Sequence, residues 1–572
     1  MKKILLPMRT AAVIVIISIL TTIAPLSSRA AYTPPVSTMK IGLYYNTTAL
    51  PSGNLQNVNG FGSGFEFGYY DSNREFVPIG VSTGETAITM AIDRNISWHP
   101  GAGGGAGEYR EGTGGSVVVG CFHIRTAVYE TFEQAKADAE QYQDSFIKYE
   151  SGQFCVMIGQ YTTRAEAESD MSARGLTEGY VDSGTTNTIA VVKTGTNQMI
   201  FEFDYEGTRH LAVRPRQVHD EKPETWFKGY RYRGGFQYIR QAAAQLTVIN
   251  YVAIEDYIKG ILPHEMNNAW PIEALKAQAC CARTYALASL GSHSAHGFDL
   301  CTTDHCQVYG GREQANERTD RAVEETAGMY ITYNGTLCKT FYASSDGGAS
   351  ESSENVWHDA LPYLRGVVDP YEADVAAKIP NYNWTVTYTP EQITQRLRSR
   401  GHNCATIVKM AVTAYTPTGN ALTVTLTDVN GTKFTFSKRD QILPALGVIT
   451  QRFKIGNSAY EPGAIFVNDP AQIVAADSQF YAMNSSGVAV AVPPDGQMYA
   501  ITGAGSVELV TGDTNPGAVD DNGMVNGVFV IRGTGRGHLV GMSQWGAYSM
   551  AEYHRKSYIE IIKFYYTGVE VG

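Results

Sequence analysis

Three charged side chains in the middle of the chain could act together on one substrate. Glu265 precedes a helix that Pro271 is expected to begin. Proline lacks a backbone N–H, and in the first turn of a helix this N–H would have no partner within the helix, so proline is tolerated there. Lys276 and Arg283 are seven residues apart in that helix, about two turns, so they project from the same side. One carboxyl group and two cations can therefore converge on one cleft. The residue types alone favour the alternative, a core helix with a surface Glu and a solvated Lys and Arg.

Glu265 has the surroundings of a proton donor. A carboxyl group that donates a proton near neutral pH needs a raised pKa, which partial burial provides. The flanking residues are apolar: Ile261, Leu262, Met266 and Trp270. Ordinary glycosidases also need a second carboxylate. The spacing of the carboxylates in the sequence does not single out a partner for Glu265. Asp346 and Glu351 are candidates for the second carboxylate, so hydrolysis remains an alternative.

A second group of side chains could bind a metal ion. Cys301, His305 and Cys306 lie close together, and His293 and His296 precede them. Thiolate and imidazole ligands together suit tetrahedral zinc. A disulfide between Cys301 and Cys306, with His305 at the surface, is the alternative. The chain has eight cysteines, which would permit disulfides in an exported protein.

Two predicted helices must position Glu265 and the cations. Residues 253–262 (AIEDYIKGIL) place apolar side chains at helical spacing, and Pro263 is expected to end this helix. The following helix has an apolar stripe formed by Ile272, Leu275, Ala279, Ala282 and Ala286. Runs of alternating polarity at 200–205 and 244–250 predict strands. The expected fold class is therefore α+β.

The chain is long enough for several domains. Lys2, Lys3 and Arg9 precede an apolar run, so residues 1–31 are predicted to be a signal peptide or an N-terminal anchor. The remaining predicted parts are a strand-rich segment at 38–105, a small module at 108–182, and a large domain at 188–572 with a β-rich insertion near 457–530. We expect the protein to be secreted, or anchored to the membrane, outside the cytoplasm.

The chain resembles the SpoIID/LytB family over roughly residues 190–572. The motifs that carry the resemblance are Glu265-Met266, 272–279 (IEALKAQA), 282–285 (ARTY), 299–309 (DLCTTDHCQVY), 341–357 (FYASSDGGASESSENVW) and 535–547 (GRGHLVGMSQWGA). The resemblance implies a lytic transglycosylase with Glu265 as the catalytic acid, and only this resemblance favours the cleft over the core helix. It also implies that substrate is contacted by Lys276, Arg283, Ser344, Ser345, His538 and Gln544. Leu539 replaces a glycine that is usual in the family, and we expect its bulk to alter the backbone.

The same resemblance implies a cofactor and partners. Some members of the family bind zinc beside the active site, which here implies a structural Zn²⁺ held by His296, Cys301, His305 and Cys306, with His296 preferred to His293. The expected substrate is the MurNAc-GlcNAc strand of peptidoglycan, stripped of peptides, in sporulation or cell-wall remodelling. Expected partners include an amidase or other sporulation wall proteins. The alternative is a non-catalytic, wall-binding enhancer of an N-acetylmuramoyl-L-alanine amidase.

The module at 108–182 contains a duplicated strand–helix pattern, with helices at 131–142 and 163–174. It resembles a sporulation-related repeat (SPOR) domain, which implies binding to glycan strands; an unrelated α+β insertion is the alternative. A net charge of −11, with only 18% charged residues, argues against a nucleic-acid binder, which would present a basic face.

Overall fold

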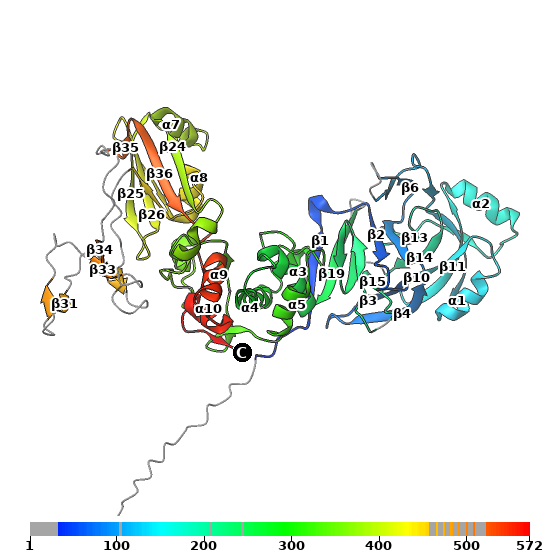
Figure 1. Ribbon diagram of the computed structural model, residues 1–572. Helices are drawn as coiled ribbons and strands as arrows, with labels where there is room; N and C mark the ends of the chain where they lie inside the picture. The colour runs from blue at the N-terminus through cyan, green and yellow to red at the C-terminus, as the bar shows by residue number, and fades with distance from the viewer. Residues whose placement is uncertain are drawn as a thin grey trace, which may run out of the picture.

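The computed structural model describes residues 32–456 and 522–572, apart from 102–105, 206–208, 219 and 242–244. Between 457 and 521 it describes only the backbone of six short strands. The described chain forms a strand-rich first lobe, a helical centre and a mixed second lobe (Figure 1). Helices and several sheets occur together, which confirms the predicted α+β class. None of the helices in the described ranges is long and apolar enough to span a bilayer. The predicted signal segment, 1–31, lies outside the described residues.

The first lobe contains two large sheets. The seven-stranded sheet has the order β20 (Leu300–Cys301), β1 (Thr38–Tyr44), β19 (Gln245–Ala253), β18 (Gly235–Gln241), β15 (Leu211–Pro215), β3 (Phe65–Tyr70) and β4 (Phe76–Thr83). The ten-stranded sheet has the order β12 (Tyr180–Asp182), β9 (Phe122–Tyr129), β11 (Gln153–Tyr161), β10 (Ser145–Glu150), β14 (Met199–Asp204), β13 (Ile189–Lys193), β5 (Ala87–Ile92), β2 (Ser52–Asn57), β16 (Thr225–Phe227) and β17 (Tyr230–Tyr232). A small sheet joins β7 (Glu108–Glu111), β6 (Ile96–His99) and β8 (Val118–Val119).

One end of the ten-stranded sheet is a βαββαβ unit. Its chain order is β9, α1 (Phe132–Ala139), β10, β11, α2 (Arg164–Ala173) and β12, and its strands lie in the order β12-β9-β11-β10. Thr131 and Thr163 cap the two helices by accepting hydrogen bonds from backbone N–H groups. Helix α1 packs on β9, β10 and β11, and α2 packs on β9, β11 and β12. This unit falls within the predicted module at 108–182.

The helical centre follows directly from β19. Helix α3 (Ile254–Glu265) begins at the residue after that strand, and it packs against α4 (Ile272–Ala288) and α5 (Glu317–Glu324). Pro263 lies inside the last turn of α3 and does not end the helix, so the prediction of an end there is wrong. Helix α4 is buried on nearly all sides, and its many alanines favour the helix and let neighbouring helices approach closely.

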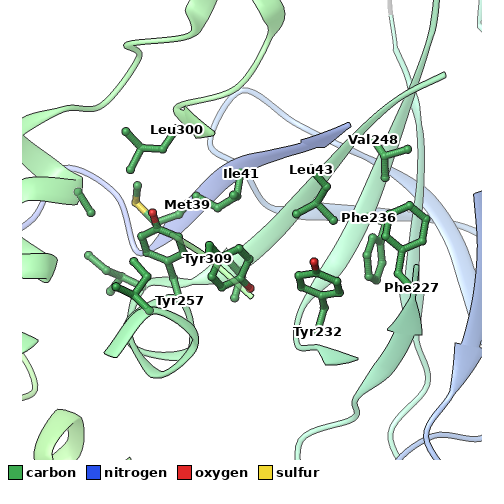
Figure 2. Packing of buried hydrophobic residues seen from close by; sticks show 14 of the residues in the cluster. Met39, Ile41, Leu43, Phe227, Tyr232, Phe236, Val248, Tyr257, Leu300 and Tyr309 are labelled. Atoms are coloured by element: carbon green, nitrogen blue, oxygen red, sulfur yellow. The ribbon is translucent and has the colours of Figure 1, made fainter. Parts of the chain in front are cut away.

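The core between the first sheet and α3 fixes the direction of that helix. Figure 2 shows Met39 and Ile41 of β1 near Tyr257 of α3 and Tyr309, and Leu43 of the same strand near Tyr232 and Phe236. Tyr309 donates a hydrogen bond to Asn250 Oδ1 of β19, at 2.9 Å. A buried strand, a helix and a loop are thereby held together just ahead of the end of α3.

The second lobe has its own core. It contains the sheet β24 (Asn383–Tyr388), β36 (Val528–Thr534) and β28 (Phe453–Ile455), with β35 (Met524–Val525) on β36, and the sheet β25 (Ile407–Tyr415), β26 (Ala421–Asp428) and β27 (Lys433–Ser437). Its helices are α7 (Pro390–Arg398) and α8 (Lys438–Leu446), and α6 (Ser353–Val356) packs on α8. Three two-stranded pairs follow in the chain: β29 (Ile465–Phe466) with β30 (Ile473–Val474), β31 (Tyr481–Met483) with β32 (Ala489–Ala491), and β33 (Tyr499–Ile501) with β34 (Val507–Leu509).

The C-terminal segment returns to the helical centre. Helices α9 (Gln544–Glu552) and α10 (Tyr558–Tyr565) pack on α4, as Figure 1 shows. Strand β37 (Met542–Ser543) pairs in parallel with β23 (Tyr342–Ala343), and β38 (Glu570–Val571) joins β21 (Ile331–Tyr333) and β22 (Thr336–Leu337). Short 3₁₀ turns occur at Asn46–Thr48, Ser294–His296 and Glu372–Lys378. Residues about 200 apart in sequence therefore meet at the end of α3.

Candidate active site

Glu265, the last residue of α3, lines a pocket of about 680 Å³. Gln544 donates a hydrogen bond from Nε2 to Glu265 Oε2 at 3.3 Å. The other residues lining this pocket are Tyr285, Asp304, His305, Cys306, Gln307, Val308, Phe341, Tyr342, Ala343, Ser344, Trp357, Arg439, Arg536, Gly537 and His538. The pocket therefore combines the helical centre, the β23–β37 pair and α8 of the second lobe.

Burial raises the pKa of Glu265 above its ordinary value. Hydrogen bonds from Gln544, the Val308 backbone and the Tyr342 hydroxyl oppose this rise without cancelling it. Gln307 positions Tyr342 by donating to its hydroxyl at 3.2 Å, and the same Gln307 accepts a hydrogen bond from Tyr257 of α3. The site thus holds a carboxyl group whose pKa is shifted in the direction that a general acid requires.

Aromatic rings form one wall of the pocket. The ring centroids of Phe341 and Trp357 lie 4.5 Å apart, and those of Trp357 and His538 lie 5.2 Å apart. Burial lowers the pKa of His538 to about 4, so its imidazole is neutral at physiological pH. His538 Nδ1 accepts a hydrogen bond from the Val540 backbone N–H at 3.0 Å. A neutral, apolar wall of this kind suits the face of a sugar ring.

Leu539 has a backbone conformation that favours glycine. Its φ is +66°, in the left-handed region that L-residues rarely adopt, and its side chain is buried. The neighbouring His538 lines the pocket. Leu539 therefore places local backbone strain next to the pocket.

The structure separates the predicted substrate-binding residues into two groups. Ser344, His538 and Gln544 line the pocket with Glu265. Ser345 does not, because it is fully buried and donates its hydroxyl hydrogen bond to Glu372 Oε2 at 2.8 Å. Ser345 therefore supports the loop that carries Ser344.

Lys276 and Arg283 do not reach the pocket, so the predicted convergence of two cations on Glu265 is not found. Arg283 is fully buried and donates two hydrogen bonds to Glu255 of α3, at 2.9 and 2.7 Å. Lys276 forms ion pairs with Glu273 at 2.9 Å and Glu325 at 2.7 Å. Helical spacing correctly placed both cations on one side of α4, but that side faces the core and α5.

The cations that line the pocket are Arg439 of α8 and Arg536, both from the second-lobe half of the chain. Sequence reasoning missed them, together with Tyr342, Trp357 and Asp304. Trp357 belongs to the family-like motif at 341–357, so that motif could have indicated that Trp357 lies at the site. Nothing in the local pattern of Arg439 pointed to a site, because it reaches the pocket only through packing of the second lobe on the centre.

The proposed second carboxylates also lie elsewhere. Glu351 is buried and accepts hydrogen bonds from Thr416 at 2.6 Å and Asn420 at 2.8 Å. Asp346 is buried as well. Within the described part of the chain, Asp304 is the other carboxylate that lines the pocket, and it is exposed.

Asp346 belongs to a buried cluster with Asp369 and Glu372 behind the Ser344–Ser345 loop. Burial, followed by the charge of Glu372, raises the pKa of Asp346 well above its ordinary value. Burial raises the pKa of Glu372 to about 7. Glu372 accepts hydrogen bonds from Ser345 and Ser543, so this cluster joins the loop before the pocket to strand β37.

Replacing Asp346 by Asn should make the stability of the protein less dependent on pH. Because the folded-state pKa of Asp346 is raised, its contribution is fully present below the unfolded-state pKa and is lost as pH rises through the folded-state pKa. Asn cannot ionise, so the free energy of unfolding of the variant should fall less than that of the wild type as pH rises from about 5 to 8. Urea denaturation at each pH measures this. The exposed Glu391→Gln should keep the wild-type slope; equal slopes in wild type and Asp346→Asn would contradict the prediction.

The predicted metal ligands also meet beside the pocket, with one correction. His293, Cys301, His305 and Cys306 each place one ligand atom within 4.8 Å of the others. His293 takes the place predicted for His296, whose Nε2 faces Asn46 Nδ2 at 3.4 Å. The 3₁₀ turn at Ser294–His296 explains the exchange, because it directs the two histidines differently.

These four residues fit a zinc ion. Cys306 Sγ lies 3.3 Å from His293 Nε2 and 3.5 Å from His305 Nδ1, and Cys301 Sγ lies 3.7 Å from His305 Nδ1. Sulfur and nitrogen ligands on one tetrahedral zinc ion are about 3.5 Å apart. Both thiols are free, so the alternative Cys301–Cys306 disulfide is absent, and so are disulfides at Cys121 and Cys155.

Comparison with known proteins identifies the central part of the chain. Residues 242–333 match the family model described as Stage II sporulation protein, SpoIID. An uncharacterized protein of Brachyspira hyodysenteriae is 29% identical over 346 residues, covering 60% of this chain and 73% of that protein. The Stage II sporulation protein D of Bacillus subtilis is 25% identical over 340 residues, covering 57% and 76%.

The amidase enhancer of Bacillus subtilis is 28% identical over 324 residues, covering 54% of this chain. The match spans only 39% of that relative's length. The segment matched by the family model contains α3, α4, Glu265 and the four residues of the His293–Cys306 cluster. Residues 242–333 of the chain are therefore similar to the SpoIID family.

Proposed function

We propose that the protein is a lytic transglycosylase that cleaves peptidoglycan between MurNAc and GlcNAc and leaves 1,6-anhydroMurNAc ends. The observation that carries the proposal is Glu265, a carboxyl group with a raised pKa in an aromatic-walled pocket. The similarity to Stage II sporulation protein D supports a role in sporulation or cell-wall remodelling.

A single carboxyl group can perform both proton transfers of this reaction. Protonated Glu265 donates its proton to the glycosidic oxygen, so the bond from that oxygen to C1 of MurNAc breaks and GlcNAc leaves as an alcohol. The resulting carboxylate then takes the proton of the MurNAc C6 hydroxyl while O6 bonds to C1. One C–O bond breaks and another forms, Glu265 ends protonated, and no water is consumed.

The surroundings of Glu265 support a glycan substrate. Trp357 and Phe341 offer faces for sugar rings, and Gln544 and Ser344 offer hydrogen-bonding partners for hydroxyl groups. Arg439 and Arg536 supply positive charge suited to the carboxyl group of a MurNAc lactyl ether from which the peptide has been removed. This last point supports a peptide-stripped strand as the preferred substrate.

The βαββαβ unit of β9–β12 supports a SPOR-like glycan-binding module. Together with the apolar run in residues 1–31, a wall substrate favours an extracytoplasmic protein, either secreted or anchored to the membrane. An amidase that strips peptides from the strand is a fitting partner, since its product would be this protein's substrate.

A second candidate function is non-catalytic enhancement of an amidase. The observation that favours it is the similarity to the amidase enhancer of Bacillus subtilis. In that case the pocket would hold the glycan strand without cleaving it. The two candidates differ in whether the strand is cut, so one experiment separates them.

That experiment is mass spectrometry of peptide-free glycan strands incubated with the purified protein and with Glu265→Gln. Anhydro-ended fragments made by the wild type alone would support the transglycosylase. Fragments with reducing ends would support hydrolysis and direct attention to Asp304. Strands that stay intact but co-sediment with the protein would favour the enhancer.

We further propose that His293, Cys301, His305 and Cys306 hold a structural Zn²⁺, which would fix the loop carrying Gln307 and Val308 against the pocket. His293→Ala should remove one equivalent of bound zinc and lower the melting temperature, whereas His296→Ala should do neither. Atomic emission and thermal unfolding of the two variants measure this. Equal zinc loss in both variants would contradict the assignment of His293.

A further inference from the structure

A second group of side chains that could hold a metal ion lies deep in the first lobe, away from the pocket of Glu265. Asp93, His123 and Glu202 are buried, with exposed fractions of 4%, 1% and 0%. One ligand atom from each lies within 4.8 Å of those of the other two. All three residues precede the segment that matches SpoIID, which begins at residue 242. The proposed reaction does not involve them.

The fold brings these three residues together from separated strands. Asp93 follows β5, His123 lies on β9 and Glu202 lies on β14. Strands β11 and β10 stand between β9 and β14 in the sheet order, so in a flat sheet β9 and β14 would be about 14 Å apart. Bending of the sheet therefore concentrates one imidazole and two carboxylates at a single buried point.

His123 turns its Nε2 toward the two carboxylates. Its Nδ1 lies 2.7 Å from the carbonyl oxygen of Gly159, and because a carbonyl only accepts, Nδ1 must carry the proton that is donated. In the neutral ring this leaves a lone pair on Nε2. A backbone carbonyl that fixes the tautomer of a metal-binding histidine is a common arrangement in metal sites.

The three side chains point at one another without forming hydrogen bonds. His123 Nε2 lies 3.0 Å from Glu202 Oε1 and 4.0 Å from Asp93 Oδ1. Yet His123 Nε2, both carboxylate oxygens of Glu202 and Asp93 Oδ2 have no hydrogen-bond partner among the described residues. Two ligand atoms bonded to one ion at about 2.1 Å lie roughly 3.0–3.4 Å apart. The distance from His123 to Glu202 falls in this range, whereas the distance from His123 to Asp93 is longer, so Asp93 would have to move closer to reach the same ion.

Among the described residues, His123 is the one basic side chain within ion-pair distance of either carboxylate, at 3.0 Å from Glu202 and 4.0 Å from Asp93. Lys148 is the nearest lysine, but its ammonium group pairs with Asp182 at 3.0 Å and Glu150 at 3.1 Å. Arg240 donates its hydrogen bonds to backbone carbonyls of residues 185 and 188. Burying two carboxylates with too little positive charge beside them is costly. A divalent ion at the convergence point would supply more positive charge than the single imidazole can.

Space beside Asp93 is kept by a glycine. A Cβ atom on Gly184 would lie 1.7 Å from Asp93 Oδ2, and Gly184 has a φ of +63°. A side chain at position 184 would therefore displace the Asp93 carboxylate from the cluster. The glycine at this turn preserves the arrangement of the three groups.

We propose that Asp93, His123 and Glu202 bind a divalent first-row transition-metal ion such as Zn²⁺ or Mn²⁺. The imidazole nitrogen disfavours Ca²⁺ and Mg²⁺, which prefer oxygen ligands only, and the two carboxylates suit a borderline ion rather than Cu⁺. The bound ion ties β9 of the βαββαβ unit to β5 and β14 of the sheet that continues it. The βαββαβ unit is thereby fixed to the rest of the first lobe, so it does not move as an independent module.

The test is metal binding by the full chain in a Cys301→Ser/Cys306→Ser background, which removes the thiol ligands of the other cluster. After treatment with a chelator, Zn²⁺ and Co²⁺ are titrated and the bound metal is counted. We expect one equivalent to bind, with a rise in melting temperature and without the intense absorption that thiolate ligands give to Co²⁺. In the same background Glu202→Gln, which keeps the shape of the side chain, should lose this equivalent.

Controls keep the test decisive if a variant is unstable. His402→Ala, a change in the second lobe, should leave the metal count unchanged. The thiol-free protein is itself sufficient, because the question is whether it binds an ion at all. If it is folded by circular dichroism and binds neither Zn²⁺ nor Co²⁺ at micromolar concentration, or if Glu202→Gln still binds one equivalent, the proposal is wrong and the cluster holds water or a charged imidazole.

Discussion

Glu265→Gln should lower the rate of glycan cleavage roughly 10²- to 10⁴-fold, the range that general acid–base catalysis contributes. Gln cannot donate the proton that the leaving oxygen needs, but it keeps the size of the side chain. Its amide can still hydrogen-bond to Gln544, so binding of the strand should be nearly unchanged. The rate of formation of anhydro ends, measured by mass spectrometry, and co-sedimentation with glycan strands give the two quantities separately.

Asp304→Asn is the matched control, because Asp304 is the other carboxylate that lines the pocket in the described part of the chain. With Glu265 acting alone, Asp304→Asn should keep most of the wild-type rate. A loss as large as that of Glu265→Gln, together with reducing ends in the wild-type products, would instead indicate a two-carboxylate hydrolase.

The pH dependence of the reaction gives an independent check on Glu265. Burial raises the pKa of this carboxyl group, and the acid form is the one that donates. The rate should therefore fall as pH rises through the raised pKa, rather than near the ordinary pKa of a glutamate. A rate that rises steadily from acid to alkaline pH would contradict the role of Glu265 as the acid.

Arg283→Ala should destabilise the fold by about 3–5 kcal/mol, the cost of removing one partner of a buried ion pair. Arg283 is fully buried, and it donates to Glu255 and to the backbone carbonyls of Val323 and Met329. The substitution leaves a cavity and several acceptors without a donor. Urea denaturation followed by circular dichroism measures the loss.

Lys276→Ala is the matched control on the same side of α4. Its ion pairs involve partly exposed carboxylates, so it should cost only about 0–1 kcal/mol. If Arg283→Ala does not fold, Arg283→Lys should fold with a smaller loss, because the charge remains while the two-pronged contact with Glu255 is broken. Wild-type stability in Arg283→Ala combined with lost glycan binding would restore the substrate-binding role predicted from the sequence.

Several features of the site follow from short stretches of sequence. The local pattern around Glu265, an apolar helix, a carboxylate and a proline-started helix, made it a candidate, and the family motifs then singled it out. Cys301, His305 and Cys306 are close enough in sequence that almost any local fold keeps their ligand atoms near one another. Alternation and helical spacing also sufficed for the α+β class. These properties depend on local backbone periodicity, which sequence reports directly.

The tertiary structure alone decided which residues surround Glu265. Helical spacing placed Lys276 and Arg283 on one side of α4, but only packing shows that this side faces α5 and the core. Whether His293 or His296 joins the thiols depends on a single 3₁₀ turn. Arg439 and Gln544 reach the pocket because the second lobe packs on the helical centre and because β37 pairs with β23. Residue spacing thus determined which side chains could do chemistry. Long-range packing determined which of them meet, because residues that pack together from distant parts of the chain produce no periodic pattern in the sequence.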